Sequence, residues 1–164
     1  MDQTRSSIYI DLSKYFARGL HEGFLGILPE ISLIRLIRDP ITNMRSFLNR
    51  DKFFFLDNNR PESKSNLLRL NSTDMEKGEL YLWIWCELYL RFNQMLACSK
   101  VVKHVEIRTE RLDETTYLEE ALDILEVEHN SIEKRDHTNT NASKGFCKTK
   151  VFVHIHEILK EGIL

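Results

Sequence analysis

The hydrophobic pattern divides the chain into short strands and amphipathic helices. Runs rich in β-branched and aromatic residues predict strands at 8–11, 31–37 and 101–107. Apolar residues spaced three and four apart predict helices at 13–28, 40–50, 73–98, 113–127 and 150–164. The last segment also contains alternating Val151, Val153 and Ile155, which suit a strand. Both alternatives stay open for it, and helix is preferred.

The strand at 31–37 is the centre of the predicted fold. Its apolar residues lie too close together for a strand with one exposed face, which indicates a parallel sheet covered on both faces. Strands that alternate with helices predict an α/β protein with three layers, a short parallel sheet flanked by helices. We expect a single domain over residues 1–164, with irregular loops near 51–72 and 128–147.

Two of the predicted helices begin at recognisable capping residues. Pro40 suits a first helical turn, where its missing N–H is not needed, and Asp39 or Thr42 is expected to cap the exposed amides. The acidic helix at 113–127 is expected to be capped by Asp113 or Thr115.

The helix at 73–98 is apolar around most of its circumference. Thr73 and Glu76 have the spacing of a capping box and predict its start. Glu87 and Arg91 lie four residues apart in the favourable order for an ion pair. A buried pair would need a partner charge or a ligand, so we predict an ordinary surface pair.

Composition predicts a soluble domain in a reducing compartment. The 164 residues are 42% hydrophobic and 29% charged, which is enough for one core. The three cysteines are an odd set without Cys-x-x-Cys spacing, which argues against disulfides and zinc. The N-terminus has no apolar signal-like run, and the most hydrophobic helix carries two charges, so no membrane span is expected. We therefore expect a cytoplasmic protein without a metal or a nucleic-acid partner.

Basic residues gather in the first half of the chain. Residues 34–69 hold eight basic and four acidic residues, whereas residues 106–128 hold nine acidic and two basic ones. Arg38 lies at the carboxyl end of the central strand, where open α/β sheets bind ligands, and a helix N-terminus follows. Ser46, two turns into that helix, adds a hydroxyl. The plain alternative is that Arg38 and Asp39 only form the strand-to-helix turn.

The strand at 31–37 and the segment after it resemble a motif of the sulfotransferases that use 3′-phosphoadenosine 5′-phosphosulfate (PAPS). The residues that carry the resemblance are Arg38, Pro40 and Ser46. In that family a strand ends in Arg-x-Pro, and a Ser lies eight residues after the Arg. The resemblance implies that Arg38 and Ser46 hold the 3′-phosphate of the nucleotide. A later strand of the family ends in an acidic residue and Leu, a place that Glu110 and Leu112 fit.

The resemblance extends to the C-terminal region. Sulfotransferases close the nucleotide site with an Arg-Lys-Gly loop, and the matching residues here are Lys144 and Gly145, with Ser143 in place of the Arg. Gly145 would let the backbone approach a phosphate, and Lys144 would supply a compact charge. The three Phe residues at 53–55 are expected either to border an acceptor pocket or to cover the end of the core.

The resemblance covers nearly the whole chain but only the C-terminal part of such an enzyme. The family's first strand and Gly-rich loop, which hold the 5′-phosphosulfate, have no counterpart in these residues. It implies a partial P-loop-type fold that transfers sulfate to a hydroxyl acceptor only when the missing half is supplied. The general base and the acceptor are unknown, and whether this chain is an enzyme is left open.

Two other hypotheses remain. The chain could be a non-catalytic α/β interaction domain, or a degenerate homologue, whose exposed apolar surface is covered by another subunit or a second copy. The weaker one is a phosphoryl-transfer enzyme, because no Gly-x-x-x-x-Gly-Lys-Ser/Thr loop is present.

Overall fold

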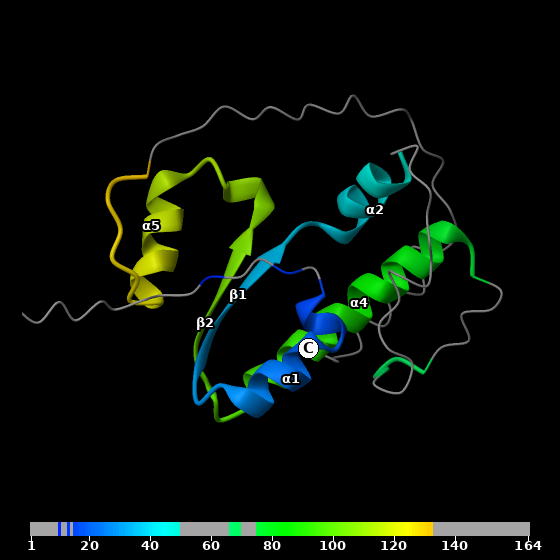
Figure 1. Cartoon of the computed structure of the whole chain (residues 1–164). Coiled ribbons are helices and arrows are strands. Elements are labelled where there is room, and N and C mark those ends of the chain that lie inside the picture. The colour runs from blue at the N-terminus through cyan, green and yellow to red at the C-terminus, as the bar shows by residue number, and fades with distance from the viewer. Residues whose placement is uncertain (1–9, 11–12, 14, 50–65, 70–74, 133–164) are drawn as a thin grey trace, which may run out of the picture.

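The computed structural model describes residues 10, 13, 15–49, 66–69 and 75–132 (Figure 1). This part contains two parallel strands and four α-helices, and it is an α/β structure as predicted. The elements in chain order are α1 (Leu20–Ile27), β1 (Ile31–Ile37), α2 (Pro40–Leu48), α4 (Lys77–Leu96), β2 (Val101–Arg108) and α5 (Thr115–Ile124). Two 3-10 helices complete the set, Phe16–Arg18 and Thr109–Arg111.

The two strands pair in parallel, which confirms the predicted kind of sheet. Ile31 is opposite Val101, and Ile37 is opposite Arg108, with an irregularity between Ile31 and Ser32. Parallel neighbours need a long crossover, which here contains α2 and α4. The predicted strand at 8–11 lies outside the described residues except for Ile10, which is in no strand.

Helices lie on both sides of the sheet, with α4 and α1 on one side and α5 on the other (Figure 1). On the α4 side, Leu33 of β1 packs against Phe92 and Met95. On the α5 side, Val105 of β2 packs against Ala121 and Leu125. The arrangement is compatible with the expected three layers.

One face of β1 differs from the prediction that both faces are covered. Ile34 and Leu36 are 41% and 58% exposed, although their strand neighbours Leu33 and Val105 are buried. The reason is that α5 packs on β2 rather than across both strands. Within the described residues, apolar side chains of β1 are therefore buried on the α4 side and exposed on the other.

The helix starts agree only in part with the predicted caps. The carboxylate of Asp39 accepts a hydrogen bond from the N–H of Thr42 (2.7 Å), with Pro40 in the first turn, as expected. For α4 the predicted box is wrong, because Glu76 is the N-cap rather than the third helical residue. The side chain of Glu79 accepts the N–H of Glu76 (2.9 Å), so the same spacing recurs three residues later.

The predicted cap of α5 is also wrong. Glu114 holds the N-cap position and makes no capping bond, because Arg111 binds its carboxylate at 2.6–3.0 Å. The guanidinium of Arg111 also lies over the ring of Tyr117, 3.8 Å from its centroid.

The predicted helix at 13–28 is interrupted at Gly19. A 3-10 helix ends at Arg18, and α1 begins at Leu20, with Gly19 between them at φ 135° and ψ −21°. This backbone conformation favours glycine because a Cβ would collide with the chain. The break turns one periodic pattern into two short helices.

Gly19 and Gly23 should respond to alanine in opposite ways. Gly19→Ala should lower the free energy of unfolding by about 1–2 kcal/mol, because alanine strains the left-handed backbone. Gly23 lies inside α1, and a methyl group added there would meet no other atom. Gly23→Ala should therefore raise the free energy of unfolding by about 0.5–1 kcal/mol. Urea denaturation of both variants measures the difference, and equal effects would contradict the strained turn.

Candidate functional site

The carboxyl ends of β1 and β2 meet at one edge of the sheet. Ile37 is opposite Arg108, so the residues that follow both strands lie beside each other. Arg38 and Asp39 follow β1, and the 3-10 helix Thr109–Arg111 follows β2. The edge therefore combines cationic side chains with the N-terminus of α2, the kind of place where α/β sheets bind anions.

Arg38 and Ser46 occupy the elements that the sequence predicted for them. Arg38 lies between β1 and the N-cap Asp39, is half-buried, and makes no hydrogen bond or ion pair with another described residue. Ser46 lies in α2, about two turns after the N-cap Asp39. A guanidinium and a hydroxyl are groups that suit the oxygens of a phosphate.

A carboxylate also belongs to this corner. Glu110 Oε1 accepts a hydrogen bond from the N–H of Asp39 (3.2 Å). Partial desolvation alone would raise the pKa of Glu110, but hydrogen bonds from backbone N–H groups and the charge of Arg38 together lower it. The sequence showed only an acidic residue in this position. It did not show that the carboxylate reaches a backbone amide of the neighbouring strand end.

Tyr117 ties α5 to the same end of β2. Its hydroxyl donates to the carbonyl of Glu106 and accepts from the N–H of Arg108, each at 3.0 Å. The Arg108 side chain itself is 65% exposed and only 3.9 Å from the Glu106 carboxylate. The backbone at the carboxyl edge is thus fixed, while Arg108 points to solvent.

The second half of the expected phosphate clamp is not described. Lys144 and Gly145 lie outside the described residues, as do the Phe residues at 53–55. The expected convergence of Lys144 with Arg38 on one phosphate therefore stays a prediction.

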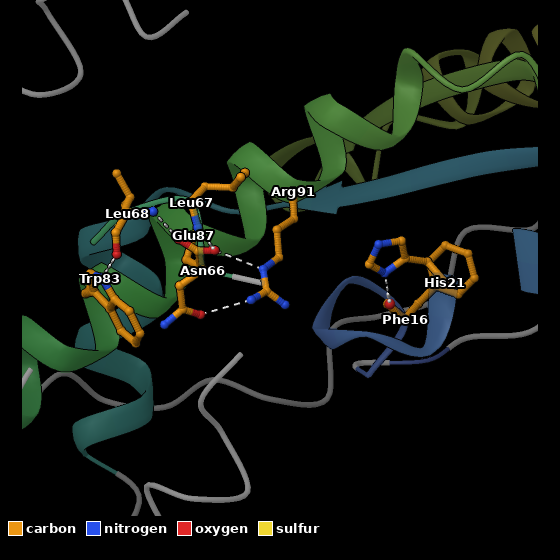
Figure 2. A network of polar contacts seen from close by, with 8 residues as sticks. All are labelled: Phe16, His21, Asn66, Leu67, Leu68, Trp83, Glu87 and Arg91. Carbon is orange, nitrogen blue, oxygen red and sulfur yellow. Dashed lines mark hydrogen bonds and ion pairs between the residues drawn. The ribbon is translucent and has the colours of Figure 1, made fainter. Parts of the chain in front are cut away.

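The largest departure from expectation is the Glu87–Arg91 pair in α4, which is buried rather than at the surface. Glu87 is 0% exposed and Arg91 2% exposed, and Arg91 Nε donates to Glu87 Oε1 at 2.9 Å. Figure 2 shows that residues 66–68 lie against this turn of the helix. We call Asn66, Leu67 and Leu68 the strap.

The strap makes further hydrogen bonds to both charges (Figure 2). Glu87 Oε1 accepts the N–H of Leu67 and Oε2 accepts the N–H of Leu68, each at 2.7 Å. Arg91 Nη2 donates to the side-chain oxygen of Asn66 at 2.9 Å. Burial of the Glu87 carboxylate is tolerated because both of its oxygens accept hydrogen bonds in this way.

A second arginine joins β1 to α4. Arg35 forms an ion pair with Glu106, its neighbour in the register, and Nη1 donates to Asn93 Oδ1 at 2.7 Å. Its guanidinium lies 4.1 Å from the ring centroid of Tyr89 and 4.9 Å from that of Phe92. Arg35 therefore connects β1 and β2 with α4 through an ion pair, a hydrogen bond and two ring contacts.

Comparisons with known proteins give no family for this chain. No family model matches it, and no curated protein and no solved structure is significantly similar to it. None of the described helices is long and apolar enough to cross a bilayer. Among the same residues, no three His, Cys, Asp or Glu side chains gather at metal-binding distance.

Replacing Arg91 by alanine should strongly destabilise the protein. The Glu87 carboxylate would stay buried without its cation, which costs about 3–5 kcal/mol of unfolding free energy. Arg45 is an exposed arginine of α2, and Arg45→Ala should change stability by no more than about 0.5 kcal/mol. Urea denaturation compares the two, and similar losses would show that the burial of Arg91 is unimportant.

Arg38 should contribute modestly to the lowered pKa of Glu110, after the hydrogen bonds that the carboxylate accepts. A carboxyl with a lowered pKa in the folded state adds stability above its ordinary pKa, and that stability disappears as the pH falls through the lowered value. In Arg38→Ala the pKa of Glu110 should rise towards its ordinary value but not reach it, because the Asp39 N–H still donates. Carboxyl-carbon NMR titration measures this, with Arg45→Ala as the unchanged control. An unchanged pKa of Glu110 in Arg38→Ala would show that the charge of Arg38 does not act on this carboxyl group.

Proposed function

We propose that this chain is the 3′-phosphate-binding part of a sulfotransferase-like protein that uses PAPS. The observation that carries the proposal is the position of Arg38 at the carboxyl end of β1, beside the end of β2 and directly before α2. Its guanidinium is half-buried at this edge, and its positive charge also lowers the pKa of Glu110 across the sheet.

The chemistry of the carboxyl edge suits a terminal phosphate. A phosphate takes charge-assisted hydrogen bonds from a guanidinium and a further bond from a hydroxyl, the groups that Arg38 and Ser46 supply. The negative charge of Glu110 repels an anion at this corner. Its carboxylate also occupies the N–H of Asp39, which an anion could otherwise use. A ligand would therefore need the additional cation that we assign to Lys144, with Gly145 allowing close backbone approach.

The proposal limits what this chain does alone. Sulfate transfer requires a group that holds the 5′-phosphosulfate and a base for the acceptor hydroxyl, and we assign no described residue to either role. We propose that transfer occurs only when another segment or a partner chain supplies a Gly-rich phosphate loop, on a P-loop-like fold. We further propose a cytoplasmic location, in keeping with the free thiols of Cys86 and Cys98.

A second proposal, a non-catalytic interaction domain that oligomerises, is favoured by one observation. Ile34 and Leu36 expose apolar side chains on a parallel strand, and strands of this kind are normally covered on both faces. A second subunit on this face would remove that surface from water.

Thermal unfolding with two nucleotides tests the first proposal against the second. 3′-Phosphoadenosine 5′-phosphate and AMP differ only in the 3′-phosphate, so the first should raise the melting temperature more. At a hundredfold excess over its dissociation constant, its shift should be roughly 5–10 °C. Arg38→Ala should abolish the difference, and Arg45→Ala should keep it because Arg45 is exposed elsewhere on α2.

Two outcomes would contradict nucleotide binding. Equal shifts in melting temperature for the two nucleotides in the unmodified protein would contradict a site for the 3′-phosphate. A tight dimer in size-exclusion chromatography that is indifferent to both nucleotides would favour the interaction domain instead.

A further inference from the structure

The contact between α4 and the strap has an unusual construction for the interior of a protein. Leu67 and Leu68 donate successive backbone N–H groups to the two oxygens of one carboxylate, at 2.7 Å each. The side chain of Leu67 is 42% exposed, so apolar burial alone does not hold this residue in place. Its amide is held by a hydrogen bond to a fully buried charge.

The neighbouring contacts use the same turns of α4. Trp83 Nε1 donates to the carbonyl of Leu68 at 3.3 Å, and the Leu68 side chain packs against Leu80, Trp83 and Ile84. Arg91, one turn beyond Glu87, binds the Asn66 side chain. Three consecutive strap residues are thus bound by side chains at 83, 87 and 91, spaced by one helical turn each.

We infer that Glu87 and Arg91 form a latch that closes the strap onto α4, and that the strap opens and closes as one unit. Opening any single contact removes one hydrogen bond from a buried charged side chain, so partial opening is costly. Complete opening lets water reach Glu87 and Arg91 together. The latch is independent of the proposed nucleotide site, which lies at the carboxyl edge of the sheet.

Native-state hydrogen exchange of the full chain tests the latch. In the unmodified protein the Leu67 and Leu68 amides should be protected to the same degree, because both depend on one carboxylate. Glu87→Gln places an amide donor against one of these N–H groups, and it should accelerate both amides roughly 10- to 100-fold. Amides of β2, such as Val105, are compared in the milder variant Asn66→Ala, because Glu87→Gln also leaves the buried charge of Arg91 without its carboxylate. Glu120→Gln, an exposed change in α5, should alter none of them.

A milder variant guards against loss of the whole fold. Asn66→Ala removes only the contact with Arg91 and leaves the carboxylate contacts, so it should accelerate Leu67 and Leu68 together by a smaller factor. Exchange of the two amides at the rate of an unstructured peptide would overturn the latch. An equal acceleration of strap and β2 amides in Asn66→Ala would also overturn it. Such a result would mean that the strap exchanges only when the whole protein unfolds.

Tryptophan fluorescence gives a second measurement of opening. Trp83 is 4% exposed beneath the strap, and Trp85→Phe leaves it as the single tryptophan of the chain. Iodide quenching in this background should be low, and it should increase several-fold when Asn66→Ala is added. Unchanged quenching, despite faster exchange at Leu67 and Leu68, would show that the strap does not open as a unit.

Discussion

The burial of two ionised groups inside α4 is the constraint on which the described structure depends. A carboxylate removed from water needs hydrogen-bond donors, and Glu87 receives them from Arg91 and from two backbone N–H groups. This requirement fixes the strap against one side of α4. On other sides α2, the sheet and the 3-10 helix before α1 pack against the same helix, which is the central scaffold.

Much of the fold followed from periodicity, because strands and helices bury apolar residues at different spacings. The burial of Glu87 and Arg91 did not follow, since an i, i+4 pair has the same spacing whether water or protein surrounds it. The strap binds the pair through hydrogen bonds, and its residues Asn66 to Leu68 carry no periodic signal. The break at Gly19 was missed for a related reason, because the apolar spacing continues across it.

The candidate site was predictable to a similar degree. Arg38 and Ser46 could be placed because they follow an apolar strand and a proline, which fix the strand end and the helix start. The contact of Glu110 with Asp39 depends on the pairing of two strands far apart in sequence, and no local pattern encodes it. The apolar residues Ile34 and Leu36 led to the prediction that both faces of β1 are covered. The described helices leave these two side chains exposed.

The distance in sequence between the paired strands has a consequence for the order of folding. Ile31 pairs with Val101, seventy positions later, whereas the carboxylate of Glu87 meets an amide only 20 positions away. Closing a longer chain segment costs more entropy, so short-range contacts form earlier. During synthesis, strap and α4 can assemble while β2 is still in the ribosome. The sheet, with the carboxyl edge it creates, is then completed late in folding.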